Sequence, residues 1–79
     1  MNNKKTISLE ELPDILTAQD IADYLKISRR RVYEYFQIHP DHGGILNFEA
    51  GEASKRAEKD DLIDWIKKRK EEKLKQFAN

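Results

Sequence analysis

Three consecutive arginines, Arg29 to Arg31, are the residues whose type and position most favour chemistry with an anionic ligand. A guanidinium group donates paired hydrogen bonds to phosphate oxygens or to the edge of a guanine base. The arginines directly follow Ser28, and Tyr33, Glu34 and Gln37 follow at helical spacing. Because cations at a helix N-terminus oppose the helix macrodipole, their presence at this position indicates an anionic partner.

Two short helices joined by a tight turn are predicted to position these side chains within Leu16–Gln37. Thr17 is a candidate N-cap for the first helix with Asp20 three residues later, and Ser28 can cap the second. The predicted apolar faces are Ile21, Ala22 and Leu25 in the first helix and Val32, Tyr35 and Phe36 in the second. This pattern is typical of a helix-turn-helix that reads DNA. The alternative is a structural hairpin whose arginines are merely solvated.

The composition limits the chain to one small domain. Its 79 residues can support one modest core. The absence of cysteine excludes disulfides and thiolate metal sites. No apolar run approaches the roughly 20 residues of a membrane span, and the N-terminus lacks the apolar region of a signal peptide. We therefore expect a cytoplasmic protein without membrane contact.

The charge is balanced overall but segregated along the chain. The 15 basic and 15 acidic residues cancel, yet residues 1–28 carry −2, residues 29–37 carry +2 and residues 67–75 carry +4. Local fields decide which face meets a polyanion. Because a neutral monomer binds DNA weakly, we expect useful affinity to depend on cooperation between copies on DNA.

A loop, a two-stranded hairpin and a long helix are predicted to follow the arginine-led helix. Proline and glycine residues indicate a loop over residues 38–44. Residues 45–50 are predicted to form one strand and residues 54–57 its partner. The last helix is predicted to open at Lys59 or Asp60. Its apolar face would consist of Leu62, Ile63 and Ile66, with Trp65 at the edge.

The chain is predicted to have three parts. Residues 1–8 are predicted to be a flexible N-terminus, residues 9–70 the folded domain and residues 71–79 a C-terminal helical extension. At the start of the domain, the segment of residues 9–16 is predicted to pack on the core through Leu9, Leu12, Ile15 and Leu16.

The residues that carry a family resemblance run from Leu16 to Trp65, about two thirds of the chain, and fall in four segments, the last of which continues to Arg69. The first helix and turn of the family are resembled by LTAQDIADYLKIS, and its recognition helix by SRRRVYEYF. The wing strand is resembled by GGILNFEAG, and the closing helix by KDDLIDWIKKR. Together they resemble the excisionase-type winged helix-turn-helix domain, the compact relative of MerR-like regulators in mobile elements and phages. The resemblance implies a mainly α fold with a small β-hairpin. Lys26 departs from the family where glycine is frequent, and Glu49 and Glu52 depart at wing positions that are commonly basic.

This reading implies double-stranded DNA as the partner, bound by the helix from Ser28 in the major groove. The expected DNA-binding residues are Ser28, Arg29, Arg30, Arg31, Tyr33, Glu34, Gln37, Lys55 and Arg56. Arg29 and Arg30 would lead base or phosphate contact, with Tyr33, Glu34 and Gln37 refining sequence choice. Arg31 and the two hairpin cations would mainly hold the phosphate backbone. Two roles share this chemistry: an architectural factor that works with a recombinase, and a transcriptional regulator of a mobile element.

The motifs of enzymes and metal sites are absent from the sequence. His39, Asp41 and His42 offer two imidazoles and a carboxylate, but no cysteine or third histidine completes a metal site. The chain has neither a Ser-His-Asp spacing nor a phosphate-cradling glycine loop. We expect no enzymatic activity, no metal and no cofactor.

The C-terminal extension carries an alternative function. Leu74 and Phe77 lie beyond the expected core and predict an exposed apolar strip on the last helix. The strip either packs back on the domain or pairs copies of the chain. The competing functional class is a protein-interaction adaptor that uses this helix and does not bind DNA.

Overall fold

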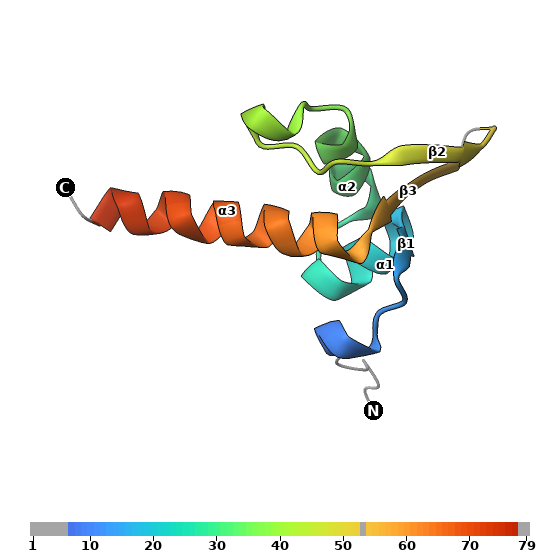
Figure 1. Cartoon of the computed structure of the whole chain (residues 1–79), viewed down its shortest axis with the longest axis horizontal. Helices are drawn as coiled ribbons and strands as arrows, with labels where there is room; N and C mark the ends of the chain where they lie inside the picture. Colours follow the sequence, from blue (N-terminus) through green and yellow to red (C-terminus); the bar gives the residue numbers. More distant parts are fainter. Residues whose placement is uncertain (1–6, 53, 78–79) are drawn as a thin grey trace.

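The computed structural model describes residues 7–52 and 54–77 and shows a mainly helical α/β chain (Figure 1). In chain order the elements are the 3₁₀ turn η1 (Leu9–Glu11), β1 (Ile15–Thr17), α1 (Ala18–Leu25), α2 (Arg29–Phe36), the 3₁₀ turn η2 (Pro40–His42), β2 (Phe48–Gly51), β3 (Ser54–Glu58) and α3 (Lys59–Phe77). The predicted order of two helices, loop, hairpin and long helix is confirmed. Residues 1–6 of the expected flexible N-terminus and residues 78–79 of the expected extension lie outside the described residues.

The sheet has three strands, and the predicted two-stranded hairpin was therefore incomplete. The antiparallel order is β1-β3-β2, so that β1 joins the far side of β3. Leu16 of β1 lies opposite Ala57 of β3, and both are fully buried. Because successive strand side chains leave opposite faces, the neighbouring Ile15 points outward and is 45% exposed. The prediction that Ile15 packs on the core was wrong.

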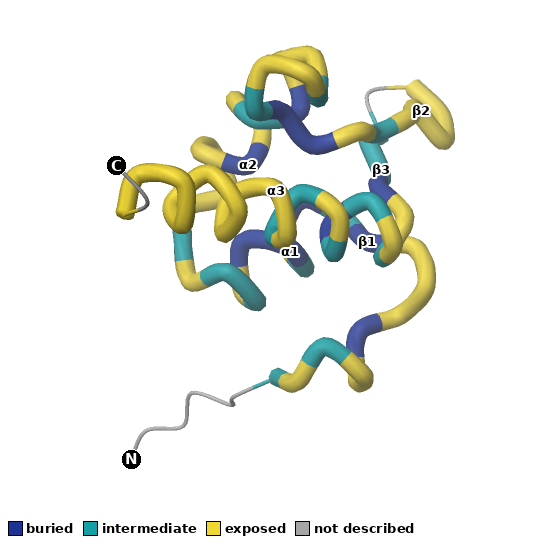
Figure 2. The backbone as a smooth tube through the Cα atoms, turned by 60° about the vertical axis from the view of Figure 1, so that its left-hand side comes forward, coloured by how far each residue is buried: buried dark blue, intermediate teal, exposed yellow. Residues whose placement is uncertain are grey.

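The core draws on residues from across the chain. Leu16, Ile21, Val32, Ile45 and Leu62 are the largest side chains that are fully buried. Figure 2 accordingly shows buried segments on α1 and α2, on β3 and on the loop that leads to β2. Complete burial of such a side chain contributes about 1.5–3 kcal/mol. The predicted inward faces of α1, α2 and α3 are confirmed at Ile21, Val32 and Leu62.

The second half of α3 extends away from this core (Figure 1). All residues from Lys67 to Phe77 are exposed. The side chains of Leu74 and Phe77 are 65% and 74% exposed, which confirms the predicted apolar strip. The ammonium group of Lys73 lies 5.4 Å from the ring centroid of Phe77. Leu74 and Phe77 therefore face solvent rather than another element of the described chain.

The loop after α2 is folded tightly against the end of that helix. The carbonyl oxygen of Tyr35 accepts hydrogen bonds from the N–H groups of Ile38 and Ile45, at 3.3 and 3.0 Å. Gly44 lies in the space that this arrangement leaves. A Cβ atom at Gly44 would lie 1.6 Å from the carbonyl oxygen of Ile38 and 2.8 Å from that of Tyr35. Only glycine fits at this position.

Side chains of α3 hold the same loop from the other side. The indole Nε1 of Trp65 donates a hydrogen bond to the carbonyl oxygen of Gly43 at 2.9 Å. Its ring lies 5.1 Å from that of Tyr35, and the guanidinium of Arg69 lies 5.0 and 5.5 Å from the Trp65 and Tyr35 ring centroids. Trp65 is half-buried at the edge of the core, with its polar N–H satisfied. These contacts tie the C-terminal end of α2 to α3.

We expect Gly44→Ala to destabilise the protein by about 3 kcal/mol, the upper part of the range for overpacking, because the new methyl group meets backbone atoms that cannot rotate away. Gly51→Ala is the matched control. Around a Cβ at Gly51, no atom of the described residues lies within 4 Å, so a change below about 0.5 kcal/mol is expected. Urea unfolding followed by circular dichroism measures both variants. Equal stabilities would contradict the close approach at Gly44.

Candidate nucleic-acid interface

Side-chain caps define the beginnings of α1 and α2. Thr17 Oγ1 accepts a hydrogen bond from the Asp20 N–H, and the Asp20 carboxylate accepts one from the Thr17 N–H, both at 3.0 Å. Ser28 Oγ accepts a hydrogen bond from the Arg31 N–H at 3.1 Å. Each cap satisfies backbone donors that have no partner inside the helix. The N-caps predicted at Thr17 and Ser28 are confirmed.

The turn between the two helices depends on an unusual backbone at Lys26. This residue has φ 62° and ψ 44°, the left-handed conformation that glycine adopts most easily. The conformation lets the Ile27 N–H donate to the carbonyl oxygen of Ala22 at 3.0 Å, which closes α1. Contacts between α1 and α2 must therefore offset a local strain at this turn.

All seven candidate residues at α2 are exposed: Ser28, Arg29, Arg30, Arg31, Tyr33, Glu34 and Gln37. The opposite side of the helix buries Val32 and Phe36. Helical spacing brings Arg30, Tyr33, Glu34 and Gln37 to the centre of the solvent face, and Arg29 and Arg31 flank it. The structure therefore brings these predicted residues together on one accessible surface.

Glu34 lies between two of the arginines. Its carboxylate is 3.8 Å from Nε of Arg30 and 3.4 Å from Nε of Arg31. The three side chains are 51–89% exposed, so the ion pairs are screened by water and contribute little to stability. The arginines therefore remain available to another anion, which would compete with Glu34.

The two candidate cations of the hairpin lie on opposite faces of the sheet, whereas the candidates of α2 share one face. Lys55 Nζ donates to Glu49 Oε2 at 3.1 Å across the pair of strands. Arg56 is the next residue of β3, so its side chain leaves the opposite face of the sheet. Its register partners there are Phe48 on β2 and Thr17 on β1. A single flat ligand therefore cannot meet Lys55 and Arg56 from one side of the sheet.

The histidine loop follows directly after α2, with η2 at Pro40–His42. His39 Nδ1 accepts a hydrogen bond from the Asp41 N–H at 3.0 Å and caps η2. Among residues 7–52 and 54–77, no group of three or more His, Cys, Asp or Glu side chains could hold a metal ion. The observed role of His39 is to shape the loop.

The sequence-based reasoning missed two features of α3. One is the stack of Arg69 on Trp65 and Tyr35; the four-residue spacing of Trp65 and Arg69 on one helix face could have indicated their contact. The other is a groove between α1 and α3, described below. It had no signal in the sequence because its walls are more than 35 residues apart along the chain.

Comparisons of this chain with protein-family models, with curated proteins and with solved structures found no match. In the part of the chain that the structure describes, no helix combines the length and apolar character needed to cross a membrane.

We expect Lys26→Gly to stabilise the protein by about 0.5–1 kcal/mol, because glycine removes the cost of the left-handed backbone and only part of this gain is lost to a more flexible unfolded chain. Lys26→Ala is the matched control, since it removes the same charge but keeps the Cβ atom. Thermal unfolding should show a higher Tm for the glycine variant alone. Equal Tm values for both variants would contradict backbone strain at this turn.

Proposed function

We propose that this chain is a small DNA-binding protein of the winged helix-turn-helix type, in which α2 enters the major groove and the β2–β3 hairpin acts as the wing. The observation that carries the proposal is the solvent face of α2. Three arginines crowd the first turn of this helix, all exposed, with Glu34 as the carboxylate beside them. Cations in this position are unfavourable for the isolated helix, and a polyanion would relieve that cost.

The geometry of the face supports a division of roles. Arg30 lies near the centre of the solvent face, where a guanidinium can reach the edge of a guanine. Tyr33 and Gln37 share that face and would refine the choice of sequence. Arg29 and Arg31 flank it and are suited to phosphates on either side of the groove. Ser28 would contribute through its cap, which orients the first turn.

The hairpin supports a smaller contribution to binding. Lys55 is partly neutralised by Glu49, and Arg56 leaves the other face of the sheet. We infer that one of these two cations, rather than both, meets the phosphate backbone. The contact would add affinity without sequence choice.

We further propose that the protein acts in the cytoplasm on DNA of a mobile element or phage and is not an enzyme. The excisionase-like role, with a recombinase as partner, and the role of transcriptional regulator use the same DNA surface. Selection of bound fragments from random duplex DNA tests the shared part. Enrichment of a defined site supports the proposal, and its absence favours the adaptor function.

Arg30→Ala should weaken binding to the selected site by about 1–3 kcal/mol and relax the preference at one base pair, because a bidentate contact to guanine is lost. Lys68→Ala removes an exposed cation from α3 and is the control. Fluorescence anisotropy on the selected duplex and its single-base variants separates the outcomes. An equal loss on every sequence would make Arg30 a phosphate contact instead, and an unchanged affinity would remove it from the interface.

Glu34→Gln should tighten binding to unrelated duplexes by about threefold at low salt, because the carboxylate that competes with phosphate for Arg30 and Arg31 is removed. Glu71→Gln makes the same charge change on α3 and is expected to have a smaller effect. Titrations at several salt concentrations measure both. An equal change in DNA affinity for the two variants would mean that binding depends only on the net charge of the protein and not on the position of Glu34.

A further inference from the structure

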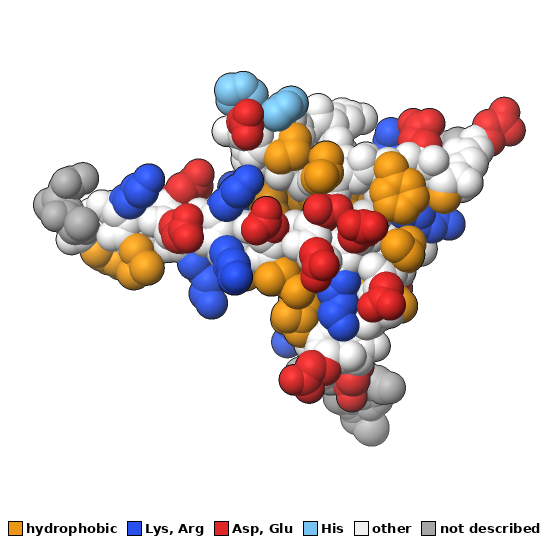
Figure 3. All heavy atoms as spheres, viewed as in Figure 1, with side chains coloured by type: hydrophobic (Ala, Val, Ile, Leu, Met, Phe, Trp, Pro, Cys, Tyr) orange, Lys and Arg blue, Asp and Glu red, His pale blue; other side chains and the backbone are white. Residues whose placement is uncertain are grey.

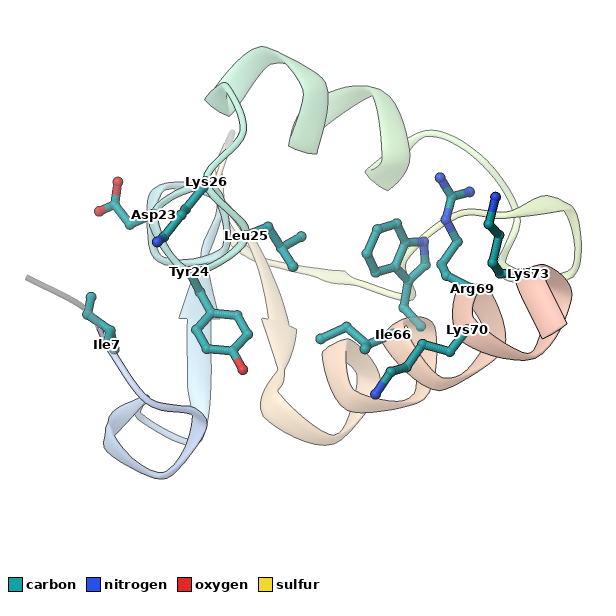
Figure 4. Close-up of a pocket in the computed structure, with 10 residues that line it drawn as sticks. Ile7, Asp23, Tyr24, Leu25, Lys26, Ile66, Arg69, Lys70 and Lys73 are labelled. Atoms are coloured by element: carbon teal, nitrogen blue, oxygen red, sulfur yellow. The ribbon is translucent and has the colours of Figure 1, made fainter.

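A groove of about 580 Å³ lies between the C-terminal end of α1 and the first half of α3. Its floor is apolar, with Tyr24 and Leu25 on α1 and Ile66 on α3, all half-buried. Figure 4 shows the side chains of Tyr24 and Leu25 directed toward Ile66 across the groove. A groove of this volume is large enough to take side chains of a partner.

The rim of the groove is strongly cationic. Lys26, Arg69, Lys70 and Lys73 line it and are all exposed. Among the described lining residues, Asp23 is the one carboxylate, which leaves a net charge of +3. An apolar floor beneath a cationic rim complements a ligand that has apolar and acidic groups side by side.

The same surface continues along the extended part of α3. Ile66, Lys70, Lys73 and Phe77 follow one another at helical spacing on one face, over about 16 Å of helix. Figure 3 shows hydrophobic and basic side chains alternating along the lower edge of this helix. The surface thus has the length of about three helical turns, with apolar positions at both ends and cations between them.

The carboxylates of this part of α3 lie elsewhere. Glu71 and Glu72 line a second hollow, which shares Trp65 and Arg69 with the groove and is completed by Pro40 and Gly43 of the loop after α2. In a symmetric pair of copies that faces groove to groove, the rim cations of one copy would oppose those of the other. The first six residues of the chain, with Lys4 and Lys5 and no carboxylate, also lack the complementary charge. DNA phosphates would match the cations but leave the apolar floor in water.

We propose that this groove, with the exposed half of α3, binds an acidic amphipathic helix of a partner protein. The apolar side chains of that helix pack on Tyr24, Leu25 and Ile66 and on Phe77 beyond them. Its carboxylates meet Lys70 and Lys73. This inference does not depend on DNA binding by α2, since the two surfaces share no residue.

The test uses the full chain and a fluorescent helical peptide of about 14 residues, with leucines at i, i+4, i+7 and i+11 and glutamates at the flanking positions. The peptide is expected to bind the wild-type protein saturably, with half-saturation at a micromolar protein concentration. The double variant Lys70→Glu, Lys73→Glu should bind at least about tenfold more weakly. Lys68→Glu combined with Lys75→Glu changes the net charge equally on the other side of α3 and should alter binding less than about twofold. These four residues are exposed, so both double variants should fold.

Two further measurements locate the contact. Phe77 is 74% exposed, so Phe77→Ser should weaken peptide binding without altering the Tm of the protein. In NMR spectra, the changes in backbone amide chemical shift on peptide addition should be largest at Tyr24, Leu25 and Ile66 and small on α2.

Three results would overturn the proposal. The first is no saturable binding by the wild type, or an equal loss in both charge-reversal pairs. The second is a dimer in sedimentation that Phe77→Ser dissociates while the peptide fails to bind, which would assign the face to a second copy. The third is duplex DNA binding that depends on Lys70 and Lys73 while the peptide fails to bind, which would assign the face to phosphates.

Discussion

The close approach of Gly44 to the end of α2 is the constraint on which the rest of the fold depends. The carbonyl oxygens of Ile38 and Tyr35 occupy the space of a side chain at this position. The chain can therefore turn back at once and insert Ile45 into the core. Asn47 then donates hydrogen bonds to the carbonyl oxygens of Phe36 and Ile45, at 2.9 and 2.7 Å, and the first strand of the hairpin begins. This backbone contact thus sets how the chain leaves α2 for the sheet, while the contacts of Trp65 and Arg69 join the same end of α2 to α3.

The balanced charge conceals two separate cationic surfaces. One is the solvent face of α2, where Glu34 contacts two arginines. The other is the rim of the groove between α1 and α3, which has an apolar floor. The first surface is polar throughout and suits a hydrophilic polyanion. The second combines cations with an apolar floor and suits a partly apolar ligand. A chain of 79 residues therefore presents two cationic surfaces of different chemistry.

Prediction from the sequence succeeded where the signal is local. The caps at Thr17 and Ser28, the apolar stripes at Ile21 and Val32 and the glycine loop are patterns within one helix or turn. It failed at β1, because a strand of three residues has no measurable alternation and exists through its pairing with β3. The outward direction of Ile15 follows from that pairing.

What the sequence by itself determined is the order of the three helices and the β2–β3 hairpin, the starts of the helices and the exposed arginine face, since caps and helical spacing act between residues a few positions apart. Only the tertiary structure decided how Trp65 meets Gly43, how Lys55 pairs with Glu49, and that Tyr24 faces Ile66 across a groove. Trp65 and Gly43 are 22 residues apart in the sequence, and Tyr24 and Ile66 lie on different helices. Such contacts depend on how whole elements pack, and no local pattern encodes that arrangement.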